Sequence, residues 1–322
     1  LLSRRQRQMC IRDRVIEELK DGRKHPAVHT YTSTLHSFAA FSGDAMPMNE
    51  VFTPGRLKEY EDWLLQRRLS WNTISTYMRT LQAVYNRLSP PGTPEHNPRL
   101  FDDVYTKVKS QIKRALTEEQ MGRLMHADLD VLSEELQRVQ AYFLLMFLFR
   151  GMPFIDLAHL RKRDVKDGKI AYRRHKTGKQ ITLRIPREAL PLLKEFKDKD
   201  ETSLYLFPIL NAAPEGDDAL YECYQKALRN FNKMLRVLAK RLLPGIKISS
   251  YTARHTWATL AYHIGMPIGI ICQALGHSSI RVTETYLKPF ENEKVDKANR
   301  KLISTVKKHE GRSGRCFIYY KT

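Results

Sequence analysis

Three short stretches near the carboxyl end organise this chain: Tyr251-Thr-Ala-Arg-His-Thr-Trp, then Leu275-Gly-His-Ser-Ser, and then Thr283-Glu-Thr-Tyr. Their polar residues stand at the edges of segments that are otherwise apolar. The pattern predicts helices over 252–264 and 267–276, each closed by a glycine. A short third helix, capped by a serine of the second stretch, is expected to carry the final tyrosine.

The region before these stretches predicts further helices. Thr117-Glu-Glu-Gln matches a capping box at the start of a helix that ends near Ala127. A buried helix is expected from Ser133 to Phe149, and it ends at Arg150-Gly151. Pro153 suits the first turn of the helix that follows.

Strand patterns come next. Asp167-Gly168 favours a hairpin turn. Apolar residues alternate with polar ones on either side of Thr177-Gly178, at Ile170, Tyr172, Ile181, Leu183 and Ile185. The fold class is therefore mainly α, with a small three-stranded antiparallel sheet in the C-terminal domain. Between Arg150 and Glu188, twelve Lys or Arg stand against four Asp or Glu. The hairpin with Lys176 beside its turn therefore either faces an anionic partner or is simply solvated.

The pattern from Val15 to about Leu88 is helical and basic, as in a small helical bundle. Asn72 is expected to cap a helix with one apolar face. That face consists of Ile74, Tyr77, Met78, Leu81, Val84, Tyr85 and Leu88. Arg79 projects from another face, where it either contacts phosphates or is solvated.

Four prolines among ten residues, Ser89 to Pro98, mark a loop or hinge after the bundle. A basic connector with Lys107 and Lys109 follows. We therefore divide the chain into a helical domain over 15–89, a linker over 90–113 and a second domain over 114–310. Residues 1–14 show no periodicity and are expected to be a non-native or disordered segment, and residues 311–322 a disordered tail.

Composition limits the partners. The 322 residues include 55 Lys or Arg and 35 Asp or Glu, a formal net charge of +20. This excess favours nucleic acid or an acidic membrane surface, and no helix with a clear lysine face supports the membrane. The longest apolar run, Ala141 to Phe149, is far shorter than the roughly 20 residues of a membrane-spanning helix. Four scattered cysteines form no CxxC pair, which favours a reducing cytoplasm.

Several familiar enzyme plans are absent from the sequence. It contains no Gly-rich phosphate loop with a following Lys-Ser/Thr, no HExxH and no GxSxG. Its acidic residues are scattered, so we expect neither a metal nor a cofactor.

Four residues could handle a phosphate without a metal. Arg254 can bind two phosphate oxygens, and His277 can donate a hydrogen bond. Tyr286 can attack phosphorus, while Lys176 can protonate the leaving oxygen. Each has a plainer alternative when taken singly: a core tyrosine, a capping histidine, an arginine in a surface ion pair or a solvated lysine.

The order and spacing of these residues resemble a known family. Arg254-His-Thr-Trp-Ala-Thr, Leu275-Gly-His-Ser-Ser and Thr283-Glu-Thr-Tyr look like the closing boxes of tyrosine recombinases, the phage integrase family. His175-Lys-Thr-Gly-Lys resembles the family's catalytic-lysine hairpin, and the N-terminal half its SAM-like core-binding domain. The similarity covers about Val15 to Thr305.

The resemblance implies a two-domain clamp around double-stranded DNA attachment sites. Tyr286 would attack the scissile phosphate, form a 3′-phosphotyrosyl link and release a 5′-hydroxyl, which Lys176 would protonate. Arg254 and His277 would hold the phosphate, without ATP, and a homotetramer would join two DNA sites. The residues expected to contact DNA are Tyr251, Arg79, Lys107, Lys109 and Lys179.

Two positions depart from the family pattern. Gly151-Met-Pro153 has proline where the family's first arginine is usual, and Arg150 would supply the guanidinium instead. That arrangement, followed by Phe-x-Asp, resembles integrases of Bacteroidetes mobile elements. Tyr251 stands where a histidine is usual, and its phenol can still hydrogen-bond a phosphate oxygen.

The departures keep two alternatives open: a catalytically impaired DNA-binding relative, and a nicking and rejoining enzyme similar to a type IB topoisomerase. The target sequence, and the choice between integration, excision and inversion, do not follow from the sequence.

Overall fold

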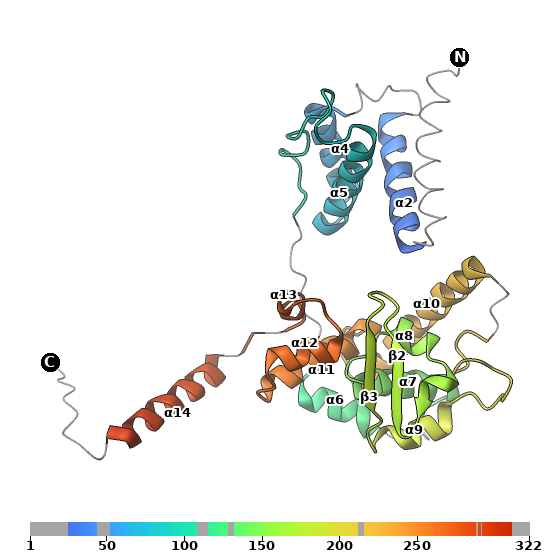
Figure 1. Cartoon of the computed structure of the whole chain (residues 1–322), viewed down its shortest axis with the longest axis vertical. Coiled ribbons are helices and arrows are strands. Elements are labelled where there is room, and N and C mark those ends of the chain that lie inside the picture. The colour runs from blue at the N-terminus through green and yellow to red at the C-terminus, as the bar shows by residue number, and fades with distance from the viewer. Residues whose placement is uncertain are drawn as a thin grey trace. The chain divides into compact units, whose positions relative to one another are not determined.

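The computed structural model describes residues 25–43, 52–107, 115–127, 132–211, 216–287, 289–290 and 292–310. Backbone contacts group the chain into two units, Leu1–Gln111 with Pro214–Glu222, and Ile112–Ala213 with Cys223–Thr322. Figure 1 shows a mainly helical protein with one small sheet, which confirms the expected fold class.

Three described helices build the first unit: α2 (His25–Ser42), α4 (Pro54–Gln66) and α5 (Trp71–Leu88). The expected apolar face of α5 is confirmed, since Ile74, Met78 and Leu81 are fully buried in one core. The N-cap assigned to Asn72 is wrong. Ser70 caps α5 instead, because its extended backbone lets its hydroxyl accept the Thr73 N–H.

The proline-rich segment after α5 folds back onto the first unit. Leu100, Phe101 and Val104 lie in the same buried core as α5. The Tyr85 hydroxyl accepts the Asn97 N–H at 2.7 Å, and the buried Glu61 carboxylate accepts the Tyr105 N–H at 2.5 Å. These contacts fix the start of the connector along the bundle.

The second unit contains most of the helices. They are α6 (Glu118–Met125), α7 (Glu134–Leu148), α8 (Phe154–His159), a 3₁₀ turn (Lys162–Asp164), α9 (Ala189–Phe196), α10 (Asp217–Leu242, from Cys223 onward), α11 (Ser250–His263), α12 (Ile268–Leu275), α13 (Ile280–Glu284) and α14 (Asn292–Glu310). The predicted capping box is confirmed, because Thr117 and Gln120 cap each other's backbone N–H at the start of α6. Buried α7 packs against α11, so α11 rests on a rigid support.

The sheet has the order β1 (Val165–Lys166), β2 (Lys169–Arg173) and β3 (Gln180–Arg184), and both pairs are antiparallel. Its first turn, at Asp167-Gly168, has positive φ at both residues, as a tight two-residue hairpin requires. Inward residues alternate with exposed ones along β2 and β3, which lie side by side in Figure 1. The strand prediction is therefore confirmed.

Candidate active site

Tyr286 lies just beyond the end of α13, where its backbone is held from two sides. Its N–H donates to the Thr283 carbonyl at 2.9 Å. Its own carbonyl accepts the Thr259 hydroxyl at 3.3 Å and the His255 Nδ1 proton at 3.4 Å, and both of these residues belong to α11. The tyrosine is half-buried, so its position is defined while its ring still reaches the surface.

Arg254 lies beneath Tyr286 and is only 2% exposed. Its NH1 donates to the Gly151 carbonyl at 2.8 Å, and its NH2 donates to the Leu275 carbonyl at 2.6 Å. The guanidinium carbon lies 5.5 Å from the centre of the Tyr286 ring. Burial, and then the nearby charge of Arg174, lower the pKa of Arg254. The cation is held by backbone carbonyls from two separate segments.

The Nε–H of Arg254 is buried and has no acceptor among the described residues. A guanidinium has five N–H donors, and three are used by Gly151, Leu275 and His277. A buried donor without an acceptor is costly, at about 1–3 kcal/mol. An anion bound at Arg254 would remove that cost.

His277 is held by a bond at each ring nitrogen. Arg254 NH2 lies 2.9 Å from Nε2, and an arginine can only donate, so Nε2 accepts. Nδ1 therefore carries the proton and donates to the Thr283 hydroxyl at 2.9 Å. Burial, and then the charges of Arg254 and Arg174, lower the pKa of His277 to about 3. The imidazole is neutral at pH 7 and supports the Arg254 guanidinium.

Two glycines allow the segments of the site to approach closely. Gly151 has φ +68°, and a Cβ there would lie 3.1 Å from the Arg254 Cα. Gly276 ends α12 with φ +65°, and a Cβ there would lie 2.7 Å from the Ile181 Cδ1. Both positions need glycine for the conformation and for the space.

Lys176 is exposed on the turn between β2 and β3, as the sequence predicted. The turn is closed by bonds from the Gly178 N–H to the Arg174 carbonyl and from the Arg174 N–H to the Lys179 carbonyl. The charges of Lys176 and Lys179 are among those that lower the pKa of His277. The hairpin therefore places Lys176 close enough to His277 for its charge to affect the histidine.

Arg174, which the sequence did not single out, is the second buried cation of the site. Only 4% of it is exposed, and its NH1 donates to the Gly276 carbonyl at 3.0 Å. Its Nε lies 3.8 Å from the buried carboxylate of Asp156, and no acceptor in the described part of the chain is closer. The sequence did hold a signal for this burial. Arg174 lies two residues after the inward-facing Tyr172, so the strand alternation places Arg174 on the same, core-facing side.

Asp156 connects α8 to the turn between β2 and β3. Its Oδ1 accepts the His175 N–H at 2.8 Å, and its Oδ2 faces Arg174. Burial raises the pKa of Asp156, while the His175 N–H and the Arg174 charge act in the opposite direction. The carboxylate therefore holds both the arginine and the backbone next to Lys176.

Arg150 and Tyr251 occupy different surroundings. Arg150 is half-exposed with φ +59° and lies next to Gly151. Burial raises the pKa of the Tyr172 hydroxyl, and the charge of Arg150 acts in the opposite direction. Tyr251, on the first turn of α11, is 44% exposed and stacks on Tyr286 with ring centres 6.3 Å apart. Tyr251 therefore lies beside Tyr286 in this structure.

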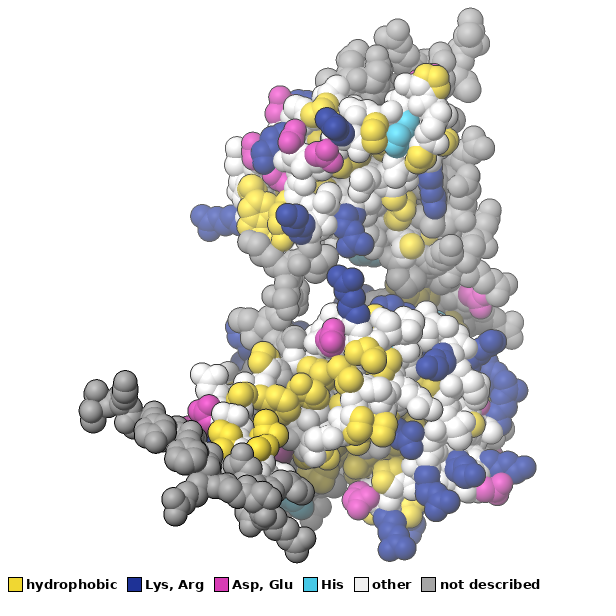
Figure 2. Space-filling model, turned by 60° about the vertical axis from the view of Figure 1, so that its left-hand side comes forward, with side chains coloured by type: hydrophobic (Ala, Val, Ile, Leu, Met, Phe, Trp, Pro, Cys, Tyr) yellow, Lys and Arg dark blue, Asp and Glu magenta, His cyan; other side chains and the backbone are white. Residues whose placement is uncertain are grey.

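The predicted DNA-contacting residues are separated by unit. Arg79 on α5 and Lys107 are exposed in the first unit, and Lys179 is exposed in the hairpin of the second. Lys109 lies outside the described residues. Figure 2 shows Lys and Arg side chains spread over both units on the face that it draws.

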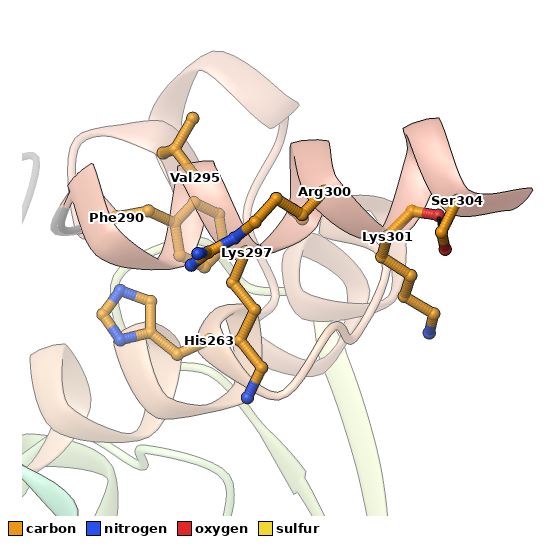
Figure 3. A pocket seen from close by; sticks show the side chains of 8 residues that line it. His263, Phe290, Val295, Lys297, Arg300, Lys301 and Ser304 are labelled. Carbon is orange, nitrogen blue, oxygen red and sulfur yellow. Dashed lines mark hydrogen bonds between the residues drawn. The ribbon is translucent and has the colours of Figure 1, made fainter.

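No group of three or more His, Cys, Asp or Glu side chains in the described ranges is placed to hold a metal ion. None of the described helices is long and apolar enough to cross a membrane. A pocket of about 900 Å³ lies where the end of α11 meets α14. Figure 3 shows its basic and apolar lining, which includes His263, Phe290 and Lys297. None of these residues belongs to the Arg254 cluster.

Comparisons with known proteins identify the family of this chain. The profile described as Phage integrase family matches residues 114–293, and that of the Phage integrase SAM-like domain matches residues 11–88. The chain is 25% identical over 309 residues to tyrosine recombinase XerA of Pyrococcus furiosus, covering 91% of this chain and 96% of that protein. It is 23% identical over 226 residues to a tyrosine recombinase of Thermosipho africanus, covering 70% and 74% of the two chains.

Solved structures share the fold. A Tn1549 transposon integrase in complex with a circular intermediate DNA aligns with a TM-score of 0.62 at 16% identity, over 90% of this chain and 99% of that one. A lambda integrase tetramer bound to a Holliday junction aligns with a TM-score of 0.60 at 16% identity, over 86% and 76% of the chains.

Proposed function

The chain belongs to the phage integrase family, and on that premise we propose that it is a site-specific tyrosine recombinase that cleaves and rejoins duplex DNA. The intermediate is a 3′-phosphotyrosyl link to Tyr286. The observation that carries this proposal is the buried Arg254, which combines an unpartnered Nε–H with a position directly beneath the Tyr286 ring. The outcome for the DNA is integration, excision or inversion.

Each side chain has a defined part in the cleavage step. The Tyr286 oxygen forms a bond to phosphorus while the bond from phosphorus to the 5′ oxygen breaks. Lys176 gives its proton to that leaving oxygen. Arg254 binds the non-bridging oxygens, where negative charge grows as the step proceeds. His277 keeps the Arg254 guanidinium in place from the other side, because its Nε2 accepts from NH2.

We assign the family's first arginine role to Arg174 rather than to Arg150. Arg174 is buried, bonds the carbonyl just before His277, and lowers the pKa of both His277 and Arg254 through its charge. The repulsion between these two buried cations would be offset by an anion bound next to both of them. Arg150 is half-exposed. The turn at Arg150 remains the basis for proposing kinship with integrases of Bacteroidetes mobile elements.

Lysine substitutions separate the two assignments. Arg174→Lys should reduce cleavage strongly, about 100-fold, because a lysine cannot reproduce the planar guanidinium. Arg150→Lys should reduce it by less than about tenfold, because an exposed cation contributes less. Single-turnover cleavage of a nicked duplex measures both rates, and a larger loss for Arg150→Lys would reverse the assignment.

The proposed partners are double-stranded DNA and further copies of the chain. Helix α14 exposes Val295, Leu302, Ile303 and Val306 at 46–62%, and these apolar side chains would be covered by a neighbouring copy in a homotetramer. Arg79, Lys107 and Lys109 would contact DNA phosphates together with Lys179. Cys223 and Cys272 are unpaired, which is in keeping with the reducing cytoplasm as the place of action.

The test uses a pool of nicked duplexes of random sequence. When cleavage occurs next to a nick, the short fragment that carries the new 5′-hydroxyl diffuses away, so the strand cannot be rejoined and the protein stays covalently attached. Wild-type protein should retain DNA through denaturation in detergent, and Tyr286→Phe should retain none. An equal yield from Tyr286→Phe, or no adduct from the wild type, would contradict the proposal.

Two alternatives have observations in their favour. Proline at position 153 and Tyr251 at the usual histidine position favour a DNA-binding relative without activity. The same chemistry without strand exchange would make the protein resemble a type IB topoisomerase. Salt-dependent DNA binding without an adduct selects the first alternative, and relaxation of supercoiled plasmid without recombinants selects the second.

A further inference from the structure

We propose that the Tyr251 hydroxyl donates a hydrogen bond to the oxygen of Tyr286, holds this nucleophile in place and stabilises the negative charge that it carries during attack. Tyr251 would thus act on the nucleophile, not on the phosphate. The proposal rests on Tyr286 being the nucleophile, as proposed above. It assigns the first turn of α11 a part in the chemistry.

The two phenols are positioned by separate, rigid elements. Their rings stack with centres 6.3 Å apart at an interplanar angle of 21°, which places the two phenol groups side by side. Tyr251 is held by the start of α11, where the Ser250 N–H donates to Asn232 Oδ1 at 2.8 Å. The two phenol rings are therefore held as neighbours by backbone segments that are already fixed.

The direction of the hydrogen bond follows from the surroundings of Tyr251. Burial raises the pKa of the Tyr251 hydroxyl to about 12, and the neighbouring Tyr286 acts in the same direction, although 44% of the side chain is exposed. Tyr251 therefore keeps its proton near neutral pH. When one of the two phenols must carry negative charge, the donor is Tyr251 and the acceptor is Tyr286.

The other side chains around Tyr286 are engaged elsewhere. His277 lies 4.8 Å from the Tyr286 ring centre to centre, but its nitrogens are bonded to Arg254 and Thr283. His255 lies 4.7 Å away and directs Nδ1 at the Tyr286 carbonyl. Tyr251 is the stacked neighbour to which we assign the hydrogen bond to the Tyr286 oxygen.

The proposed step balances without a change in Tyr251. As the Tyr286 oxygen bonds to phosphorus, its proton passes to solvent water at the exposed edge of the site. The 5′ oxygen departs and takes a proton from Lys176. Tyr251 retains its own proton throughout, and its hydrogen bond is strongest while Tyr286 is charged. The same bond assists rejoining, in which the Tyr286 phenolate is the leaving group.

Tyr251→Phe tests the proposal, because it removes the hydroxyl and keeps the ring. Single-turnover cleavage of a nicked duplex recovered from the random pool should slow at least about tenfold at neutral pH. The Kd for the same DNA should stay within about twofold, because the hydroxyl acts on the nucleophile and not on the DNA.

Tyr262→Phe is the matched control. Tyr262 lies on the same helix, and its ring packs on Phe290 at 4.7 Å, away from the Arg254 cluster. Its cleavage rate and its Kd for the same DNA should equal those of the wild type. A loss of the same size in both variants would overturn the proposal, because it would reflect general weakening of α11.

A second readout varies the nucleophile itself. Replacing Tyr286 with 3,5-difluorotyrosine gives a phenol that ionises more easily and needs less help from a donor. The rate of the fluorinated protein with Tyr251 intact, divided by its rate after Tyr251→Phe, should then shrink towards one. The inference would be overturned by an unchanged ratio, or by equal cleavage rates of the wild type and Tyr251→Phe with unmodified Tyr286. Absence of any wild-type adduct would overturn the proposed function instead.

Discussion

Arg254 combines deep burial with an incomplete set of hydrogen bonds. Backbone carbonyls and His277 account for three of its N–H groups, which fix the plane of the guanidinium. The Nε–H has no acceptor among the described residues and is available to a ligand. A site that is ordered before its anion arrives stabilises charge in the transition state without reorganisation. Arg254 is therefore both a structural link and the expected phosphate ligand.

Arg254→Lys should separate these two roles. Lysine keeps the charge but cannot donate to Gly151, Leu275 and a phosphate in one plane. We expect single-turnover cleavage to fall about 100-fold or more, while the Kd for DNA changes by less than about fivefold. Equal losses in cleavage and in binding would show that Arg254 contributes only to ground-state attraction.

His277 gives the protein a specific sensitivity to acid. Its pKa is lowered to about 3 in the folded state, whereas an unfolded histidine titrates near 6.5. The unfolded state therefore gains a proton first, and the stabilisation that is complete above about pH 6.5 is lost as pH falls towards about 3.

In His277→Gln this contribution is absent. Between pH 7 and pH 5, the wild type should lose roughly 1 to 2 kcal/mol more unfolding free energy than the variant. Urea denaturation at the two pH values measures the difference. A variant that loses as much as the wild type would mean that His277 is not held neutral.

At the scale of elements, the site depends on how closely α12 and β3 approach. Gly276 ends α12 in the left-handed region, and the Ile181 side chain occupies the space where a Cβ would lie. The same junction places the Gly276 carbonyl on Arg174 and orients His277. A change in this glycine should therefore affect folding and the site together.

Gly276→Ala should cost about 2 to 4 kcal/mol of unfolding free energy, from the positive φ and from the clash with Ile181. Gly245→Ala, also at positive φ but with open space around it, should cost about 1 to 2 kcal/mol. Adding Ile181→Val to Gly276→Ala removes the clashing Cδ1 and should restore part of the stability. Equal costs for the two glycines would argue against the steric part.

The elements themselves were predictable where local signals agreed. Periodicity indicated α5, an apolar segment closed by a glycine indicated α11, the capping box indicated α6, and Asp167-Gly168 indicated the first hairpin. The N-cap of α5 was misplaced by two residues, since Ser70 and Asn72 both suit that role and only the chain path decides between them.

Within the site, sequence spacing identified only the residues of the three closing stretches, at 251–257, 275–279 and 283–286. Arg254, His277 and Tyr286 come from these stretches and lie together in the structure. Arg174 was missed because it looks like one more cation in a basic hairpin. Its role depends on inward orientation and on contacts with Gly276 and Asp156, which are distant in the sequence.

At the scale of the whole molecule, the net charge of +20 should dominate DNA affinity. Removal of one cation that binds a phosphate should reduce the slope of log K against log salt by about 1. Lys107→Ala and Arg79→Ala should each weaken binding to all sequences by a similar factor and flatten the slope. Fluorescence anisotropy across salt concentrations measures this, and a sequence-dependent weakening would instead assign these residues to base recognition.

The measurement that tests the central claim most directly identifies the atom that carries the DNA. Wild-type protein is trapped on the nicked pool, digested with nuclease and trypsin, and analysed by mass spectrometry. We predict a nucleotide attached through a 3′-phosphate to Tyr286, in the peptide that begins at Val282. A nucleotide on any other residue, or an unmodified Tyr286 in trapped protein, would contradict the account.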